Sequence, residues 1–124
     1  PRLGRPLPMI LYDYPASQAA LAQVRPGPPN VAERFELYVD GLELANGYHE
    51  LLDADVLRQR QAAQNACRQR DGRVALPESN RLLAAMEHGL PACTGVALGL
   101  DRVLMLAAGA KSIRDVLGFS SDVA

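Results

Sequence analysis

ERFELYVDGLELAN, residues 33–46, is the stretch of this 124-residue chain with the clearest structural pattern. Phe35, Leu37 and Val39 alternate with polar or aromatic residues, and this period of two is typical of a half-buried strand. Asp40-Gly41 follows, a dipeptide that favours the type I′ turn of a two-residue hairpin because that turn needs positive φ twice. The stretch therefore predicts an antiparallel β-hairpin.

The position of the turn predicts which side chains share a face of the hairpin. The predicted cross-strand pairs are Val39–Leu42, Tyr38–Glu43, Leu37–Leu44 and Glu36–Ala45. In this register Glu36 and Glu43 are diagonal neighbours on the polar face, with Cβ atoms roughly 7 Å apart. Mg²⁺ is usually held by one or two carboxylates together with substrate phosphates. Both glutamates are therefore candidate metal ligands, and the alternative is that they simply face solvent.

A polar segment, Asn46-Gly47-Tyr48-His49-Glu50, follows the second strand of the hairpin. Glu50 could bind an amine, with Asn46 and Tyr48 beside it. Strict alternation places these three side chains on the face opposite to Glu43. A β-bulge near Gly47 is therefore needed to bring both sets of residues into one pocket.

A second candidate region is GVALGLDR, residues 95–102. Small residues at 95, 97 and 99 leave one face of a strand bare, so that a flat ligand such as adenine can lie against the backbone. Arg102 could stack on a base or bind phosphate oxygens. The alternative is close packing between the strand and the following helix. We expect residues 94–98 to form a buried strand and residues 100–108 a buried helix, because the latter are apolar nearly all round.

The other predicted elements are short strands, turns and surface helices. Seven of the nine prolines precede residue 30 and predict extended backbone, with a strand at 9–12 and helical turns at 17–23. A helix is predicted at 54–70, capped by Asp53 and ended by Gly72, and another at 80–88. Ser112 is predicted to open a short helix with a capping box. The fold class is α+β, an antiparallel sheet flanked by helices.

Composition excludes several classes of protein. With 13 basic and 14 acidic side chains, the net charge of −1 argues against nucleic-acid binding by bulk positive charge. No apolar run approaches the roughly 20 residues that span a bilayer, so no membrane association is expected. Cys67 and Cys93 are expected to be reduced thiols. Six arginines between Arg58 and Arg81 predict a solvated helix face, or else a docking patch for an acidic protein or an RNA.

Taken together, these stretches resemble the lysine-type class II aminoacyl-tRNA synthetases. The similarity lies in ERFE at 33–36, GLELANG at 41–47, and GVALGLDRVLML at 95–106, which resembles motif 3 of that class. Within the class, the chain is similar to the elongation factor P–(R)-β-lysine ligases, synthetase paralogues that lack an anticodon-binding domain. Residues 14–23, His49 and Ala97 carry this closer similarity.

The resemblance implies a domain organisation. Residues 1–124 correspond to the C-terminal portion of one class II synthetase-like catalytic domain, with motif 3 at about 95–108. Motif 1, a dimer-interface helix, and motif 2, whose arginine grips the α-phosphate, are absent from this chain. We therefore expect the isolated chain to be inactive and the activity to belong to a longer protein.

The resemblance also implies roles for individual residues. Glu36 and Glu43 would bind ATP and Mg²⁺, Leu44 and Gly99 would contact the nucleotide, and Arg102, the candidate catalytic residue, would lie against adenine and the phosphates. Glu50 would bind an amino group of the substrate, Asn46 and Tyr48 would line its pocket, and Ala97 would narrow it.

The implied function is ATP-dependent activation of (R)-β-lysine as an adenylate, followed by transfer to a lysine side chain of elongation factor P. A cytoplasmic homodimer that binds no tRNA is expected. One alternative is a fragment of a lysyl-tRNA synthetase, against which His49, Ala97 and residues 14–23 argue. The other is a non-catalytic, synthetase-like module that binds protein or RNA.

Overall fold

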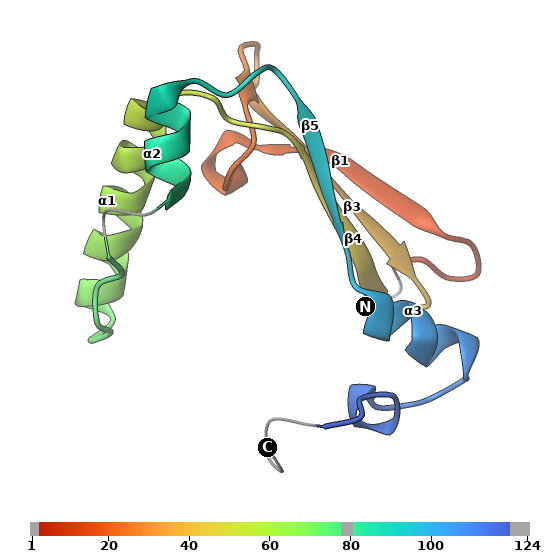
Figure 1. Cartoon of the computed structure of the whole chain (residues 1–124). Helices are drawn as coiled ribbons and strands as arrows, with labels where there is room; N and C mark the ends of the chain where they lie inside the picture. The colour runs from red at the N-terminus through yellow and green to blue at the C-terminus, as the bar shows by residue number, and fades with distance from the viewer. Residues whose placement is uncertain (1–2, 78–80, 120–124) are drawn as a thin grey trace.

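The computed structural model describes residues 3–77 and 81–119, which form an antiparallel sheet with helices at its two ends (Figure 1). The strands are β1 (Met9–Pro15), β2 (Val24–Arg25), β3 (Val31–Val39), β4 (Leu42–His49) and β5 (Thr94–Leu98). The strand order is β1-β3-β4-β5, with β2 also paired to β3. Helices α1 (Ala54–Arg70) and α2 (Arg81–His88) lie together near one end of the sheet, and α3 (Leu100–Ala107) follows β5 at the other. The α+β prediction is confirmed.

The predicted turn joins β3 to β4, but a β-bulge at Leu44 changes the register beyond it. Asp40 and Gly41 have φ values of 49° and 85°, as a type I′ turn requires. The observed pairs are Val39–Leu42, Tyr38–Glu43, Leu37–Ala45 and Glu36–Asn46. The predicted pairs Leu37–Leu44 and Glu36–Ala45 are wrong because Leu44 is an extra residue on β4. After Leu44, the alternation of β4 is shifted by one position.

The proline-rich segment contains more strand and less helix than its sequence predicts. β1 continues beyond residue 12 to Pro15, across an irregularity in pairing where Asp13 has a φ of 55°. Of the predicted helical turns at 17–23, only a 3₁₀ turn at Ala16–Gln18 forms. The following residues instead pack Ala19 and Ala22 against Ala32 of β3 and then enter β2. Packing against the sheet therefore decides the conformation of this segment.

The first predicted helix has the expected ends. The Asp53 carboxylate accepts hydrogen bonds from the backbone N–H groups of Asp55 (2.9 Å) and Val56 (3.1 Å), and Gly72 has a φ of 70° just beyond the helix. Helix α2 packs Leu83 and Met86 against Leu57 of α1. The predicted first residue of α2, Asn80, lies outside the described residues. The capping box at Ser112 is present and opens a 3₁₀ turn, Ile113–Asp115.

Substitution of Asp53 by alanine is expected to lower the free energy of unfolding by about 1 kcal/mol, because two N–H groups of the first turn of α1 lose their acceptor. Urea denaturation followed by circular dichroism measures this change. Asp53→Asn, whose side-chain oxygen can still cap, is the matched control. An equal loss in both variants would contradict capping as the cause.

β5 and α3 are more exposed than their sequences predict. Val96 and Leu98 of β5 are 64% and 51% exposed, and Leu100 at the start of α3 is 71% exposed. Among residues 3–77 and 81–119, β5 pairs only with β4, and no residue of α3 is buried. The prediction that both elements are buried is wrong for the described chain, because no described segment covers their outer surfaces.

Gly47, in the regular part of β4, allows the Phe35 ring of β3 to lie close against the strand. A Cβ atom at this position would lie 2.3 Å from Phe35 Cε1 and 3.1 Å from the carbonyl oxygen of Gly95. Gly47→Ala is therefore expected to lower the free energy of unfolding by about 1–3 kcal/mol, as over-packing typically does. Thermal unfolding tests this, with Gly118→Ala as control because no atom lies within 4 Å of its added Cβ. Unchanged stability in Gly47→Ala would contradict the contact.

Candidate active site

The bulge at Leu44 brings the candidate metal ligands Glu36 and Glu43 to the same face of the sheet as the residues of the predicted amine site. Glu43 lies on that face before the bulge, and Asn46, paired with Glu36, lies on it after the bulge. Across the next pair of strands, Ala97 stands opposite Asn46. The expectation that a bulge unites the two groups is thus confirmed, but it occurs at Leu44 rather than near Gly47, which pairs regularly with Phe35.

Glu36 is the most highly connected of the predicted site residues. It is 7% exposed, and its Oε2 atom accepts hydrogen bonds from the hydroxyls of Tyr14 (2.6 Å) and Tyr38 (2.5 Å). Its Oε1 atom accepts one from the guanidinium of Arg34. Burial raises the pKa of Glu36, but the two hydroxyl bonds and the Arg34 charge outweigh it and hold the pKa below the ordinary value. Glu36 is therefore ionised at neutral pH.

The two tyrosines remain neutral hydrogen-bond donors. Burial, followed by the bond to Glu36, raises the pKa of Tyr14 strongly. The hydrogen bond to Glu36 is the main cause that raises the pKa of Tyr38. Each hydroxyl therefore keeps its proton and directs it at the carboxylate.

Arg34 connects Glu36 to the residues around the predicted amine site. Its Nε atom donates to Asn46 Oδ1 (3.2 Å), and Asn46 Nδ2 donates to the Tyr48 hydroxyl (2.8 Å). The guanidinium also stacks over the Tyr14 ring, 4.6 Å from its centroid. A continuous chain of polar contacts thus runs from Glu36 across the sheet to Tyr48.

The sequence interpretation missed Arg34, Tyr14 and Tyr38 as site residues. Arg34 and Tyr38 stand two positions before and after Glu36, so the period of two already placed them on its face. No local signal could identify Tyr14, because its contact depends on how β1 pairs with β3.

Glu43 and Arg102 meet where β4 approaches the start of α3. Arg102 Nη1 donates to the backbone carbonyl of Glu43 (2.6 Å) and lies 3.9 Å from its Oε2 atom. The backbone N–H of Gly99 donates to the carbonyl of the bulge residue Leu44 (2.9 Å). The Arg102 and Glu43 side chains are 46% and 37% exposed, so both are accessible to a ligand.

These carboxylates supply oxygen atoms of the kind that a cation shared with a phosphate-bearing ligand would need. No group of three or more His, Cys, Asp or Glu side chains that could hold a metal occurs within the described ranges. Mg²⁺ needs no such cage, because one or two carboxylates and phosphate oxygens suffice. Glu43 is accessible, and Glu36 is ionised with three of its about four lone-pair sites in use, which leaves one for a metal.

Glu50 lies against the bare backbone of β5. A Cβ atom at Gly95 would lie 2.2 Å from Glu50 Oε1, so only glycine leaves room for the carboxylate in this position. The backbone N–H of Glu50 donates to the carbonyl of Cys93 (3.0 Å). Gly95 is paired with Tyr48. Glu50, Tyr48 and Asn46 therefore form an anionic and polar wall beside β5.

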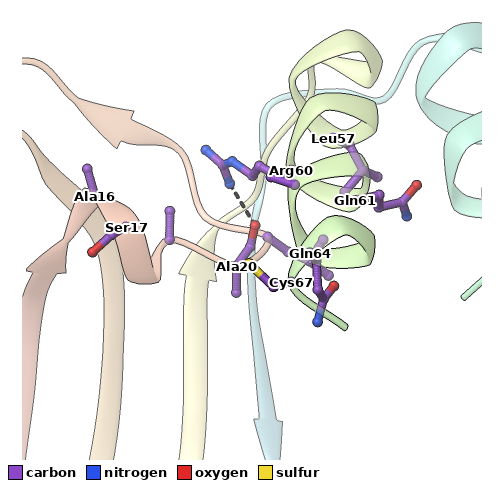
Figure 2. A pocket seen from close by; sticks show the side chains of 11 residues that line it. Ala16, Ser17, Ala20, Leu57, Arg60, Gln61, Gln64 and Cys67 are labelled. Carbon is purple, nitrogen blue, oxygen red and sulfur yellow. Dashed lines mark hydrogen bonds between the residues drawn. The ribbon is translucent and has the colours of Figure 1, made fainter. Parts of the chain in front are cut away.

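A cavity of about 700 Å³ lies elsewhere, between residues 16–21 and α1 (Figure 2). Arg60 spans the same gap, since its Nη1 atom donates to the carbonyls of Ala20 (2.7 Å) and Ala22 (2.8 Å). This arginine of the predicted surface patch thus joins α1 to the segment before β2. Cys67 at the cavity wall and Cys93 are both free thiols, as expected. The predicted site residues do not line this cavity.

Comparison with known proteins agrees with this geometry. Residues 5–123 match the family described as tRNA synthetases class II (D, K and N), and the chain belongs to this family. A Klebsiella pneumoniae relative is 52% identical over 98% of this chain and is named elongation factor P–(R)-β-lysine ligase. A relative of the same name from Edwardsiella ictaluri is 49% identical over 98% of the chain. The chain spans 38% of the length of each of these relatives.

In the described part of the chain, no helix has the length and hydropathy needed to cross a membrane.

Proposed function

We propose that this chain supplies part of the active site of a cytoplasmic, ATP-dependent ligase. The ligase would activate (R)-β-lysine as an adenylate and transfer it to a lysine side chain of elongation factor P. The observation that carries the proposal is the single face on which the bulge at Leu44 assembles Glu36, Glu43 and Asn46. The names of the relatives support the choice of substrates.

The ATP half of the site would lie at the bulge and the start of α3. Glu43 and Glu36 would hold Mg²⁺, which offsets negative charge on the phosphates. Arg102, beside Glu43, would lie against adenine and the phosphates as the catalytic arginine. Leu44 and Gly99, joined by their backbone hydrogen bond, would contact the nucleotide.

The amino-acid half of the site would lie towards the far end of β4. The Glu50 carboxylate would bind an ammonium group of the substrate, and Asn46 and Tyr48, fixed by their mutual hydrogen bond, would line the pocket. Ala97, opposite Asn46 on β5, would narrow it. Its methyl group adds bulk where a glycine would leave space, which would favour β-lysine over α-lysine.

The proposed reaction has two balanced steps. A carboxylate oxygen of the amino acid attacks the α-phosphorus of ATP, the bond to the bridging oxygen breaks, and pyrophosphate leaves. The ε-amine of the target lysine then attacks the acyl carbon, AMP leaves, and the amine gives its extra proton to solvent. Arg102 and the carboxylates act through positioning and electrostatic stabilisation, so no protein nucleophile is needed.

The proposal also covers the organisation of the protein. Residues 1–124 would form the C-terminal portion of one class II catalytic domain, and the complete protein would be a homodimer that does not use tRNA. The rest of the active site, including a second arginine for the α-phosphate, would lie outside this chain.

ATP–pyrophosphate exchange by the full-length protein tests the proposal. Exchange should strongly favour (R)-β-lysine over α-lysine. Ala97→Gly should reduce this preference about tenfold, which corresponds to a free energy of about 1.4 kcal/mol for the lost methyl contact. A wild-type preference for α-lysine would instead support a lysyl-tRNA synthetase. Absence of exchange with either amino acid would leave a non-catalytic binding module.

A further inference from the structure

We propose that Gln23 is a positioning residue that, held by His49 and Glu33, fixes the main chain of Glu50 and so the place where the substrate ammonium binds. The inference rests on the proposed role of Glu50 and extends it to three residues that do not touch the substrate. None of the three lies on the site face described above.

The backbone of Gln23 is held between two strands. Its N–H donates to the carbonyl of His49 at the end of β4 (2.8 Å), and its carbonyl accepts from the N–H of Glu33 in β3 (2.9 Å). Nearby, the N–H of Leu51 donates to the carbonyl of Leu21 (2.8 Å). The segment before β2 therefore cannot shift without moving the end of β4.

The side chain of Gln23 has two hydrogen bonds from one nitrogen atom. Nε2 donates to the carbonyl of Glu50 (3.0 Å) and lies 3.2 Å from Nε2 of His49. An amide nitrogen only donates, so His49 Nε2 must be the acceptor. The imidazole proton is then on Nδ1, which donates to Glu33 Oε2 (2.5 Å). Donors and acceptors match along the whole chain of contacts from Glu33 to Glu50.

The hydrogen bonds that lead from Glu33 to Glu50 affect the amino-acid half of the proposed active site. Glu50 is anchored on one side by Gln23 and on the other by the carbonyl of Cys93, and its carboxylate lies against Gly95. Loss of the Gln23 bond would free one anchor and let the carboxylate move relative to Tyr48. Glu43 and Arg102 lie at the opposite end of β4, so ATP binding should be unaffected.

Three variants of the full-length protein test the assignment by exchange kinetics. Gln23→Glu replaces the donor with a carboxylate facing the Glu50 carbonyl, and we expect the KM for (R)-β-lysine to rise on the order of tenfold. His49→Asn keeps a donor near Glu33 but removes the acceptor for Gln23, so it should behave like Gln23→Glu. His49→Gln keeps an acceptor at the Nε2 position and should restore a KM near that of the wild type. The KM for ATP should stay unchanged in all three, because Glu43 and Arg102 lie at the other end of β4.

A measurement independent of activity completes the test. Nitrogen NMR of histidine-labelled full-length protein should show His49 protonated on Nδ1 and bare on Nε2, with the signal assigned by its loss in His49→Gln. A proton on Nε2, an equal rise in the KM for ATP, or a His49→Gln variant as impaired as His49→Asn would overturn the proposal. If the wild type shows no exchange at all, the proposed function fails. The His49 tautomer measured by NMR then decides by itself whether the contact between Gln23 and His49 exists as described.

Discussion

Gly95→Ala is expected to raise the KM for the amino acid about 100-fold in the full-length protein while leaving the KM for ATP unchanged. The added Cβ would lie 2.2 Å from Glu50 Oε1, the far end of a flexible side chain. The carboxylate would therefore swing away while the strand stays in place. A displacement of about 1 Å in a positioning group can cost about 10²-fold in activity. Exchange kinetics with each substrate varied in turn measure the effect.

The control for this prediction is Gly118→Ala, whose added Cβ has no atom within 4 Å. Its kinetics should match those of the wild type. A Gly95→Ala enzyme with an unchanged KM for the amino acid would show that Glu50 does not bind the substrate from its present position. A parallel loss of ATP binding would point instead to a general disturbance of β5.

Glu36→Gln is expected to lower the free energy of unfolding by about 3 kcal/mol and the rate of exchange by at least about 100-fold. A carboxamide cannot accept from both tyrosines and from Arg34, because its nitrogen is a donor. With the amide nitrogen at Oε1, Arg34 loses its acceptor; with it at Oε2, both tyrosine hydroxyls do; in either orientation the partly buried guanidinium loses its counter-charge. Urea denaturation and exchange assays check the two parts of the prediction.

Glu43→Gln is the matched variant for Glu36→Gln. Its carboxylate is 37% exposed and 3.9 Å from Arg102, so we expect exchange to fall with little change in stability. Equal destabilisation by the two variants would contradict the difference between a carboxylate inside a hydrogen-bond network and one facing a ligand.

The stability lost in Glu36→Gln should depend on pH. The pKa of Glu36 is lower in the folded protein than in the unfolded chain, so its contribution is present above the unfolded value of about 4.3 and is lost as the pH falls through the folded value. The difference between wild type and variant should therefore be largest near pH 7 and shrink below about pH 4. Unfolding curves at several pH values measure this difference.

Local signals in the sequence predicted the hairpin turn and α1 accurately. Asp40-Gly41 has the positive φ values of its turn, and α1 begins after Asp53 and ends at Arg70 as expected. Such features depend on neighbours along the chain, namely turn geometry and capping. Alternation alone also predicted that Gly95 and Ala97 share one face of β5, whereas the pairing with Asn46 is what places Ala97 on the site face.

Features that depend on distant partners were not predictable in the same way. The bulge at Leu44 leaves only a partial mark in the sequence, because the change in alternation between Glu43 and Asn46 shows that a bulge is needed but not which residue is the extra one. The hydrophobic run of residues 100–107 predicts burial, yet burial also needs a covering element, and the described chain has none over α3. The bond from Tyr14 to Glu36 depends on the pairing of β1 with β3.

The extra residue in β4 makes the site unusually sensitive to one kind of genetic change. A point mutation at Leu44 alters one side chain, whereas loss of its codon would keep Glu43 and Asn46 on the same face but remove the carbonyl that accepts from the N–H of Gly99. Asn46, Tyr48 and Glu50 would then keep their face, and the start of α3 would lose one of its two hydrogen bonds to β4. Selection on this gene should therefore tolerate many substitutions at position 44, where only the backbone contacts Gly99, better than an in-frame deletion there.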